Sequence, residues 1–264
     1  MDSAEVEGGA DLFLELAGET RRLMLESLAR RPARMSTLAR ELGVTVQDVH
    51  RNVNRMMGAG LVERNDGMLH LTESGRMVAR QISYFKFVEK YSKFVNSHTL
   101  APVPDKFAQR IGVLQGCRLV ETVTLVMQEL KRLESSTSRR LKVAVTQAWP
   151  EEGSTLIDRA SRGVEVWVIV GHNTVFPKNV IDEIMPAIEK LPTAPRNRMV
   201  KQLDLALYVA DEEAAVMFPN RNGEVDMGAM FVGSDSGFVE WCSDLFDHVW
   251  ARAGPFDVMK TRIA

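Results

Sequence analysis

The segment spanning residues 36–71 constrains the fold of this chain more than any other part of the sequence. Its first apolar stretch, 36–42, predicts a short helix that ends at Gly43, because glycine is favoured where a helix stops. Thr45, with Asp48 three residues later, predicts the start of a second helix through a variant capping box. An Asp-Gly pair between two short apolar runs predicts a tight β-hairpin after this second helix.

Two helices joined by so short a turn are typical of a helix-turn-helix, whose second helix enters the major groove of DNA. Apolar residues spaced mostly three to five apart predict a preceding amphipathic helix over 11–28. The hairpin, over 61–71, stands where a winged helix carries its wing. We therefore predict an N-terminal winged helix-turn-helix over residues 10–75, as one part of an α+β chain.

The second helix has the composition of a DNA-reading element. An apolar stripe of Val49, Val53, Met56 and Met57 is expected to face the core. Glutamine and asparagine can pair with adenine edges, arginine with guanine or phosphate, and a hydroxyl at a helix start with phosphate. The same polar residues are also typical of any solvated helix face. The residues that we expect to contact DNA, including two predicted N-caps at 36 and 45, are Ser36, Thr45, Gln47, His50, Arg51, Asn54, Arg55 and Arg64.

Local charge favours double-stranded DNA as a partner, although the whole chain has a net charge of only -2. Residues 20–64 contain nine arginines and four acidic residues. Such asymmetry within a chain indicates either a nucleic-acid-binding face or simply a solvated basic one. The predicted wing carries only Arg64 and His70 as cations, so we expect it to contribute little to DNA contact.

A long linker helix is predicted over 76–97, since this stretch contains neither glycine nor proline. Its apolar side chains recur three or four residues apart and include several aromatic rings. About 22 residues of helix span roughly 33 Å, which is close to one turn of B-DNA. The stripe suits either the seam of a homodimer or packing on the C-terminal domain. A dimer bound to a palindromic operator favours the seam.

The remaining residues, 98–264, are predicted to form an α/β effector and dimerisation domain with a mixed sheet covered on both faces. The reason is that strand and helix patterns alternate along them. The predicted strands are 141–145, 164–170, 205–209, 214–218 and 228–232, and the predicted helices are 105–110, 121–133, 155–162, 180–191 and 238–252.

Two resemblances extend this interpretation. The stretch MSTLARELGVTVQDVHRNVNRMMGAGLVERNDGMLHLTESGRMV resembles the winged-helix domain of prokaryotic regulators of the MarR and ArsR type. Residues 83–254 resemble the methanogenesis-regulator middle domain of an archaeal regulator family, on VAVTQAWPE, RGVEVWVIV, FVEWCSDLFDHVWARA and the segment from Phe218 to Asp226. The resemblance implies an archaeal transcriptional regulator whose C-terminal domain is similar to the phospholipase-D-like effector domain of the sugar-sensing TrmB type.

The C-terminal domain is expected to be non-catalytic. Phospholipase-D chemistry needs His-x-Lys pairs, and none of the five histidines has a lysine two residues later. The Gly-x-Ser-x-Gly, GxGxxG and Walker A patterns are absent as well, so we expect neither an enzyme nor a cofactor. The loop 233–237 suits a helix cap or an anion site. Asp204, Asp211 and Asp226 suit turns better than a metal site, so no metal is expected.

Ligand sensing is the expected role of this domain. An effector pocket needs an apolar lining with a few fixed polar groups. The candidates for binding a small-molecule effector are Trp149, His172, Arg198, Phe218, Asn220, Asp226, Met230, Phe231 and Trp241, the last of which also suits the core or a dimer interface. Two alternatives stay open. One is a metabolite-binding protein or enzyme whose winged helix mediates protein contacts, and the other is a ligand-independent architectural DNA binder.

The two cysteines, Cys117 and Cys242, are too few for a disulfide framework, and the sequence contains no zinc-binding cluster. A reducing cytoplasm therefore fits, with the pair acting either as buried thiols or as a redox switch. The first nine residues lack the features of a signal peptide, and no apolar run of about 18 residues predicts a membrane span.

Overall fold

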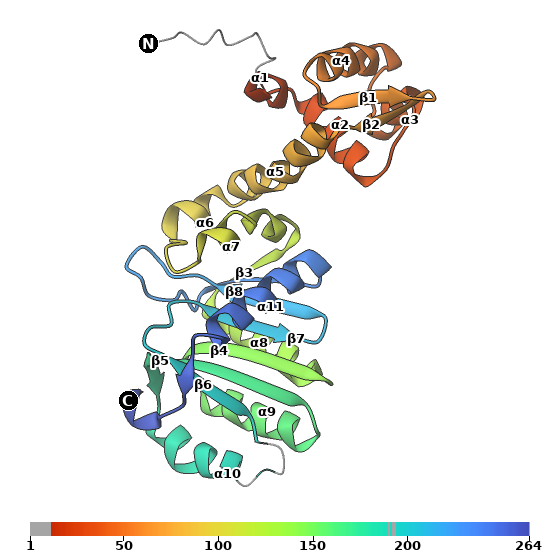
Figure 1. Ribbon diagram of the computed structural model, residues 1–264. Helices are drawn as coiled ribbons and strands as arrows, with labels where there is room; N and C mark the ends of the chain where they lie inside the picture. The colour runs from red at the N-terminus through yellow and green to blue at the C-terminus, as the bar shows by residue number, and fades with distance from the viewer. Residues whose placement is uncertain (1–11, 190, 192–193, 264) are drawn as a thin grey trace. The chain divides into compact units, whose positions relative to one another are not determined.

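The computed structural model describes residues 12–189, 191 and 194–263 (Figure 1). The chain is a mixture of helices and strands that divides into two compact units between Lys86 and Phe87, within one helix. The stretch predicted as a separate linker helix is therefore shared by the two units. Each unit is described by itself below.

The N-terminal unit is a set of helices followed by a two-stranded hairpin. Its turn has positive φ at Asp66 (49°) and Gly67 (75°), as a type I′ hairpin turn requires, so the Asp-Gly prediction is confirmed. An isolated bridge between Ala33 and Leu69 adds one short contact to the hairpin. The elements are α1 (Leu12–Leu16), α2 (Glu19–Arg30), α3 (Met35–Leu42), α4 (Val46–Gly58), β1 (Val62–Asn65), β2 (Met68–Leu71) and the first part of α5 (Glu73–Lys90).

One apolar core holds this unit together. Helices α2, α3 and α4 and both strands contribute residues to this core. Helix α5 packs closely against the start of the hairpin at Gly75. A Cβ atom at Gly75 would lie 2.0 Å from the carbonyl oxygen of Leu61, so only glycine fits there. The largest buried contributors to the core are Met24, Leu25, Leu28, Leu38, Val49, Val53, Met56, Leu61, Leu69 and Ile82.

The single helix predicted over 11–28 is wrong, because the structure breaks it at Gly18, which has an extended backbone. The side chain of Arg21 explains the break. Its guanidinium lies over Gly18, where a Cβ atom would be 2.4 Å from Arg21 Cζ. It also donates to the backbone carbonyls of Glu15 (2.8 Å) and Leu14 (3.0 Å) in the last turn of α1.

Three further expectations for this region need correction. Ser36 is not an N-cap, because α3 begins at Met35, one residue earlier, after the chain has left the bridge at Ala33 in extended form. Met57 does not face the core but is 40% exposed. The helix predicted over 76–97 starts at Glu73 and is interrupted at Tyr91, whose buried hydroxyl donates to the Cys117 carbonyl at 2.5 Å.

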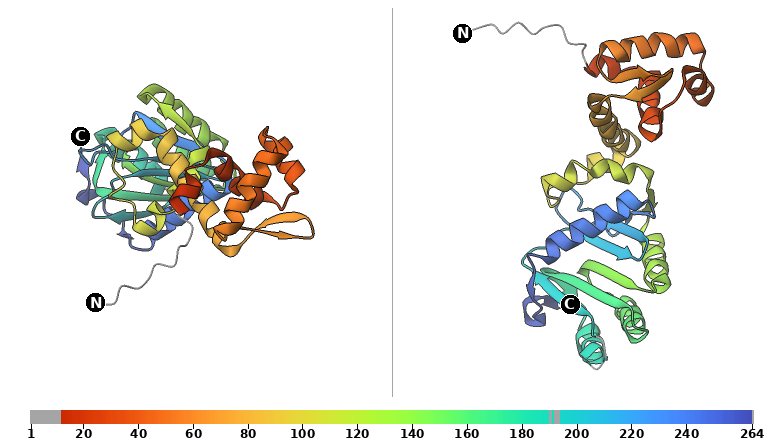
Figure 2. Two further views of the ribbon diagram at one scale, coloured as in Figure 1. Left: turned by 90° about the horizontal axis from the view of Figure 1, so that it is seen from above. Right: turned by 45° about the vertical axis from the view of Figure 1, so that its right-hand side comes forward.

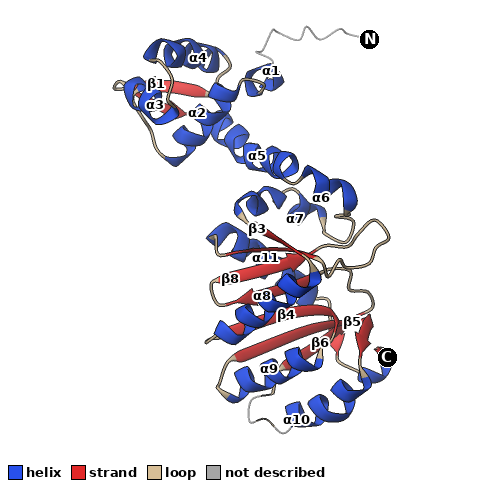
Figure 3. Cartoon of the chain, turned by 180° about the vertical axis from the view of Figure 1, so that it is seen from behind, coloured by secondary structure: helices blue, strands red, loops and turns tan. Residues whose placement is uncertain are grey.

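The C-terminal unit is built on a mixed sheet, as predicted. Figure 3 shows the strands of this sheet in red. The strand order is β10-β6-β5-β4-β7-β8-β9-β3, with β11 beside β5. Strands β4, β5, β6 and β11 pair in parallel, and the others pair antiparallel. The remaining elements are α6 (Ser92–Ser97), α7 (Asp105–Ala108), η1 (Ile111–Gly116), β3 (Arg118–Glu121), α8 (Val123–Ser136), β4 (Arg140–Gln147), α9 (Pro150–Ser161), β5 (Glu165–Phe176), η2 (Val180–Ile184), α10 (Met185–Glu189), β6 (Arg196–Val200), β7 (Ala206–Ala210), β8 (Glu213–Met217), β9 (Ala229–Gly233), α11 (Ser236–Trp250), β10 (Gly254–Pro255), η3 (Val258–Lys260) and β11 (Arg262–Ile263).

Helices cover both faces of the sheet (Figure 2). Because side chains alternate along each strand, neighbouring residues of one strand contact helices on opposite faces. Leu141 and Val143 of β4 belong to the core that α8 and α9 complete. Lys142, between them, points to the opposite face, where its ammonium group pairs with Asp247 of α11 at 2.7 Å. Pockets formed by α8 and α9 therefore lie on one face and those beside α11 on the other.

Several predicted bounds in this unit are wrong. Strand β5 continues to Phe176, six residues beyond the prediction, and α9 begins at Pro150 rather than at 155. Proline is favoured in the first turn of a helix, where its missing N–H costs nothing. Strands β3, β6, β10 and β11 were not predicted, since none of them contains more than two consecutive apolar residues. Within the described ranges, no helix combines the length and apolar character that a membrane span needs.

Candidate nucleic-acid interface

The start of α4 is fixed by its own first residues. Thr45 Oγ1 accepts a hydrogen bond from the backbone N–H of Asp48 at 3.0 Å, and its hydroxyl donates to Asp48 Oδ2 at 2.7 Å. Just before, Gly43 has a φ of 66°, the left-handed conformation in which α3 ends. The predicted glycine stop and the Thr45 cap are confirmed, and the turn over 43–45 brings α3 and α4 into contact.

The exposed face of α4 is polar along its length. Gln47, His50, Arg51 and Asn54 are all exposed, and their spacing of i, i+3, i+4 and i+7 places them on one side of the helix. The only contact between these four in the structure is the one from Asn54 Nδ2 to His50 Nδ1 at 3.5 Å, a weak one. The opposite side carries Val49, Val53 and Met56, which are fully buried. The helix therefore presents four side chains with free hydrogen-bonding capacity to solvent.

Arg51 makes a single ion pair, to Asp48 at 2.9 Å, one turn back on the same helix. The two side chains are 74% and 40% exposed. Exposed pairs of this kind contribute about 0–1 kcal/mol, so exchanging the carboxylate for a phosphate or a base costs little. The guanidinium of Arg51 is thus available for an incoming ligand.

Arg55 is differently placed, and its predicted role needs correction. Its guanidinium pairs with the buried carboxylate of Glu15 on α1 at 2.6 Å, and the hydrogen bond that it donates to Glu15 is the main reason that the pKa of Arg55 is raised. Glu15 also pairs with Arg21 at 3.0 Å, so it joins α1, α2 and α4. Moving Arg55 to a DNA contact would remove one partner from the buried carboxylate of Glu15, which would destabilise the folded unit. We therefore assign Arg55 to holding α4 in place.

The other predicted contacts lie at the edges of this face. Ser36 is exposed within the first turn of α3, and Thr45 is exposed at the start of α4. Arg64 is exposed on β1, with its guanidinium 3.5 Å from the sulfur of Met35. His70 is only half-exposed, which agrees with the expectation of a lightly charged hairpin.

One residue of the interface escaped sequence analysis. Val46, the first residue of α4, is 52% exposed, although its type predicts burial. Its place beside Gln47 makes it suitable for contact with a thymine methyl group, which apolar side chains recognise in the major groove. Its exposure could have been predicted from its position, because the residue directly after the N-cap Thr45 lies at the end of the helix.

The predicted ligand residues of the C-terminal unit do not converge on one pocket. Phe218 and Phe231 are fully buried in an aromatic cluster with Phe94, whose ring centroid is 4.8 Å from that of Phe231. Met230 is buried under α8 on the other face of the sheet, and the buried Trp241 donates to the Phe107 carbonyl at 3.0 Å. These side chains form the core, so the prediction that they line a pocket is wrong.

The polar candidates have structural partners. Asn220 Oδ1 accepts from the backbone N–H of Asn222 at 2.8 Å and shapes a turn. Asp226 accepts from His98 Nε2 at 3.1 Å. Arg198 stacks on the Trp250 ring, 4.7 Å from its centroid, and donates to that residue's carbonyl.

Two predicted ligand residues remain, His172 and Trp149. His172 is half-buried on β5, and nothing in the structure links it to the other candidates. Trp149, at the start of α9, does line a cavity. It is the one predicted ligand residue that the described structure places in a cavity suited to a small molecule.

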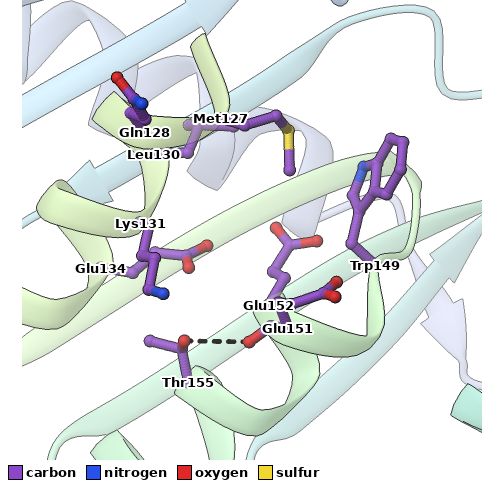
Figure 4. A pocket seen from close by; sticks show the side chains of 9 residues that line it. All are labelled: Met127, Gln128, Leu130, Lys131, Glu134, Trp149, Glu151, Glu152 and Thr155. Carbon is purple, nitrogen blue, oxygen red and sulfur yellow. Dashed lines mark hydrogen bonds between the residues drawn. The ribbon is translucent and has the colours of Figure 1, made fainter. Parts of the chain in front are cut away.

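That cavity lies between α8 and α9, and its lining includes two glutamates, the buried Glu134 and the half-buried Glu152 (Figure 4). Burial raises the pKa of Glu134 well above its ordinary value, and the nearby charge of Glu152 raises it further. Burial also raises the pKa of Glu152, although hydrogen bonds from the Tyr208 hydroxyl (2.8 Å) and from Glu134 oppose this. The pair therefore retains a proton at a pH where ordinary carboxyl groups have lost theirs.

We expect this pair to make the protein less stable as the pH rises above the range in which ordinary carboxyl groups titrate. Above that range the unfolded chain has released the protons that the folded pair still holds, so the free energy of unfolding falls with rising pH. Each unit by which the folded pKa is raised corresponds to about 1.4 kcal/mol. Thermal unfolding at several pH values checks this. Glu134→Gln should flatten the decline and unfold at a higher temperature than wild type at the upper end of the pH series, whereas Glu240→Gln, exposed on α11, should leave the decline unchanged.

Turn and cap chemistry accounts for the remaining sequence candidates. Asp235 Oδ1 accepts from the backbone N–H groups of Gly237 and Phe238, which confirms the cap at the start of α11. Asp211, with a φ of 49°, accepts from three successive backbone N–H groups at 138–140. Among the residues that the structure describes, no group of three or more histidine, cysteine or acidic side chains is placed to hold a metal ion.

The two cysteines are free and buried. Burial raises the pKa of the Cys117 thiol to about 12, and it raises that of Cys242 well above its ordinary value. Because the thiolate is the reactive form, neither thiol is suited to a redox switch, and the buried-thiol interpretation is favoured.

Comparisons with known proteins find one family that matches part of the chain and several distant structural likenesses. A family described as "HVO_A0261 N-terminal domain" matches residues 12–92, from α1 to the start of α6. No curated protein matches the chain. Among solved structures, TrmBL2, described as an archaeal chromatin protein with a novel mode of DNA binding, is 12% identical with a TM-score of 0.40 and covers 89% of this chain and 93% of its own.

Two bacterial structures each cover about half of this chain. Nuc from Salmonella typhimurium, a phospholipase D family member, is 10% identical with a TM-score of 0.40, covering 53% of this chain and 97% of its own. NucT from Helicobacter pylori is 14% identical with a TM-score of 0.42, covering 53% and 98%. Likenesses this distant assign no function to the present chain.

Proposed function

We propose that this chain is a DNA-binding transcriptional regulator whose N-terminal unit is a winged helix-turn-helix. The observation that carries the proposal is the uninterrupted polar face of α4, which follows a tight turn and a capped start and precedes a type I′ hairpin. A helix presented in this way has the length and the side chains needed to enter the major groove. The local excess of arginine over acidic residues in 20–64 favours the same partner.

Each exposed side chain of α4 has a proposed task. Gln47 and Asn54 carry amide groups that can pair with adenine edges, and His50 lies between them on the same face. Arg51 exchanges Asp48 for guanine or phosphate. Thr45 and Ser36, at the starts of α4 and α3, contact the backbone, and the hairpin contributes only through Arg64.

A mobility-shift titration of the full chain tests this proposal. The probe is the DNA upstream of the protein's own gene, with a scrambled duplex of equal length as the control. We expect a retarded complex at low salt that weakens steeply as salt is added, because arginine contacts release counterions from phosphates. No binding to either duplex at low salt would contradict the proposal.

We also propose that the protein acts as a homodimer joined through α5. Met77, Phe85 and Val88 lie on one side of this helix and are 61%, 56% and 37% exposed. Other aromatic residues of the predicted stripe, Phe87 and Tyr91, are instead buried against Phe231. Both interpretations of the stripe therefore find support, the packing one inside the C-terminal unit and the dimer one on the exposed side.

Phe85→Asp should abolish the dimer, because a charge at the centre of an apolar seam is desolvated without a partner. Light scattering after size-exclusion chromatography measures the mass, and we expect it to fall from two chains to one. DNA affinity should fall with it, since a monomer contacts one half-site only. Arg80→Ala, on the same helix, is the matched control and should remain dimeric. A monomeric wild-type chain would refute the dimer proposal.

For the C-terminal unit we propose effector sensing rather than catalysis. The support is chemical: the sequence lacks the His-x-Lys pairs that phosphodiester hydrolysis on this type of fold requires. Release of nitrophenolate from bis(p-nitrophenyl) phosphate measures such hydrolysis, and we expect none above the buffer rate. Turnover by the purified chain, lost on heating, would instead favour the enzyme alternative.

A further inference from the structure

The cavity between α8 and α9 has a volume of about 280 Å³, close to the lower end of small-molecule sites. One side is apolar and consists of Met127, Leu130 and Trp149. The carboxyl groups of Glu134 and Glu152 point into the same space from the two helices (Figure 4). A cavity of this shape suits a molecule with an apolar body and one polar end.

Two buried polar atoms at this cavity have unmet hydrogen-bonding capacity. Glu134 is 2% exposed, and its Oε1 atom has no hydrogen-bond partner among the described residues. The indole Nε1 atom of Trp149 is buried and likewise unpaired in the described structure. Buried polar atoms are satisfied in nearly all native proteins, so each such atom calls for a partner. Here both atoms border the same cavity.

The charge of the cavity selects the kind of partner. Three carboxyl groups, those of Glu134, Glu151 and Glu152, line the cavity against one cation, Lys131, so its lining carries more acidic than basic groups. An ammonium group supplies a positive charge and up to three donors, which the carboxylate oxygens, Glu134 Oε1 among them, can accept. It does not pair with the Trp149 N–H, which is itself a donor, but the Trp149 ring adds a surface on which cations are favoured. A neutral alcohol of the same shape supplies one donor and no charge.

We propose that the cavity between α8 and α9 binds a small organic amine, with the protonated nitrogen at Glu134 and Glu152 and the apolar body against Met127 and Trp149. This site would give the proposed effector sensing a specific class of ligand. Amine binding itself does not depend on the proposed function, but its role in regulation does. Binding to the isolated full chain needs no DNA, so the failure of either proposal is visible without the other.

The test compares amines with the alcohols that share their carbon skeletons. The pairs are hexylamine with hexanol, 2-phenylethylamine with 2-phenylethanol, and tryptamine with tryptophol. Calorimetric titration of the full chain and the shift in its melting temperature measure binding, and a change in tryptophan fluorescence reports on Trp149. We expect at least one amine to bind about tenfold or more tightly than its alcohol, because hydrogen bonds to ionised groups are about twice as strong as neutral ones.

Two variants assign the binding to this cavity. Glu134→Gln and Glu152→Gln keep the shape of the site and remove its charge, so each should reduce the preference for amine over alcohol to less than about twofold. Glu240→Gln, on the other face of the sheet, should leave the preference unchanged. The proposal is overturned if no amine binds better than its alcohol, or if both glutamine variants, shown to be folded by their melting curves, retain the wild-type preference.

Discussion

Arg51→Ala should weaken operator binding by about 1–3 kcal/mol, or roughly 5- to 150-fold. Arg51 is an exposed cation on the polar face of α4, and it pairs with the neighbouring carboxylate of Asp48 on the same helix. Losing it therefore removes a DNA contact without uncovering a buried charge. Fluorescence anisotropy with a labelled operator duplex measures the change, and melting temperature confirms that the variant is folded.

The sequence dependence of this loss separates two roles for Arg51. If the guanidinium pairs with a guanine edge, the loss is large on the operator and small on a scrambled duplex. If it holds a phosphate, both duplexes lose affinity alike and the salt dependence falls by about one ion. Arg80→Ala, which removes an exposed arginine from α5, should leave the affinity within about twofold of wild type. Equal affinities of wild type and Arg51→Ala would remove Arg51 from the interface.

Phe231→Ala should lower the free energy of unfolding of the C-terminal unit by about 3–5 kcal/mol. Phe231 is fully buried, and its ring lies 5.7 Å from that of Phe87, 4.9 Å from that of Tyr91 and 4.8 Å from that of Phe94. Truncation leaves a cavity at the point where the end of α5 and helix α6 pack on β9. Most of the aromatic contacts that order this part of the unit would be lost together.

Urea unfolding followed by circular dichroism measures this change. Phe231→Leu, which keeps most of the apolar volume, should recover more than half of the loss. Val123→Ala, at an exposed position of α8, should change stability by less than about 0.5 kcal/mol. If Phe231→Ala were as stable as wild type, the cluster would contribute little to the fold, and the aromatic stripe of α5 would need another explanation.

Local signals carried most of what could be predicted of the fold. Gly43, Thr45 and the Asp-Gly pair act through backbone conformation and hydrogen bonds within a few residues, and each was found as expected. The alternation of strands and helices gave the mixed sheet for a similar reason. What failed depends on contacts distant in sequence. The break at Gly18 needs Arg21, and the interruption at Tyr91 needs the Cys117 carbonyl on another element.

For the candidate sites too, local sequence signals were predictive and contacts between residues distant in sequence were not. The exposed face of α4 follows from helical spacing, so four of its polar residues were correctly placed on one side. Arg55 has the same spacing, but the partner that holds it, Glu15, lies forty residues away in sequence. The ligand residues of the C-terminal unit were chosen by type, and type alone does not separate a pocket from a core. Glu134 and Glu152 were missed because each is an ordinary helical glutamate until α8 and α9 pack together.

Selection of binding sites from a random duplex pool tests the central claim most directly, because it measures what α4 reads. The wild-type chain should enrich a short motif. A variant with Gln47→Ala, His50→Ala and Asn54→Ala keeps the capped start and the buried side of α4, so it should fold and still bind DNA through its arginines. We predict that this variant enriches no motif or a different one. Enrichment of the wild-type motif by the folded variant would show that α4 is not the reading element.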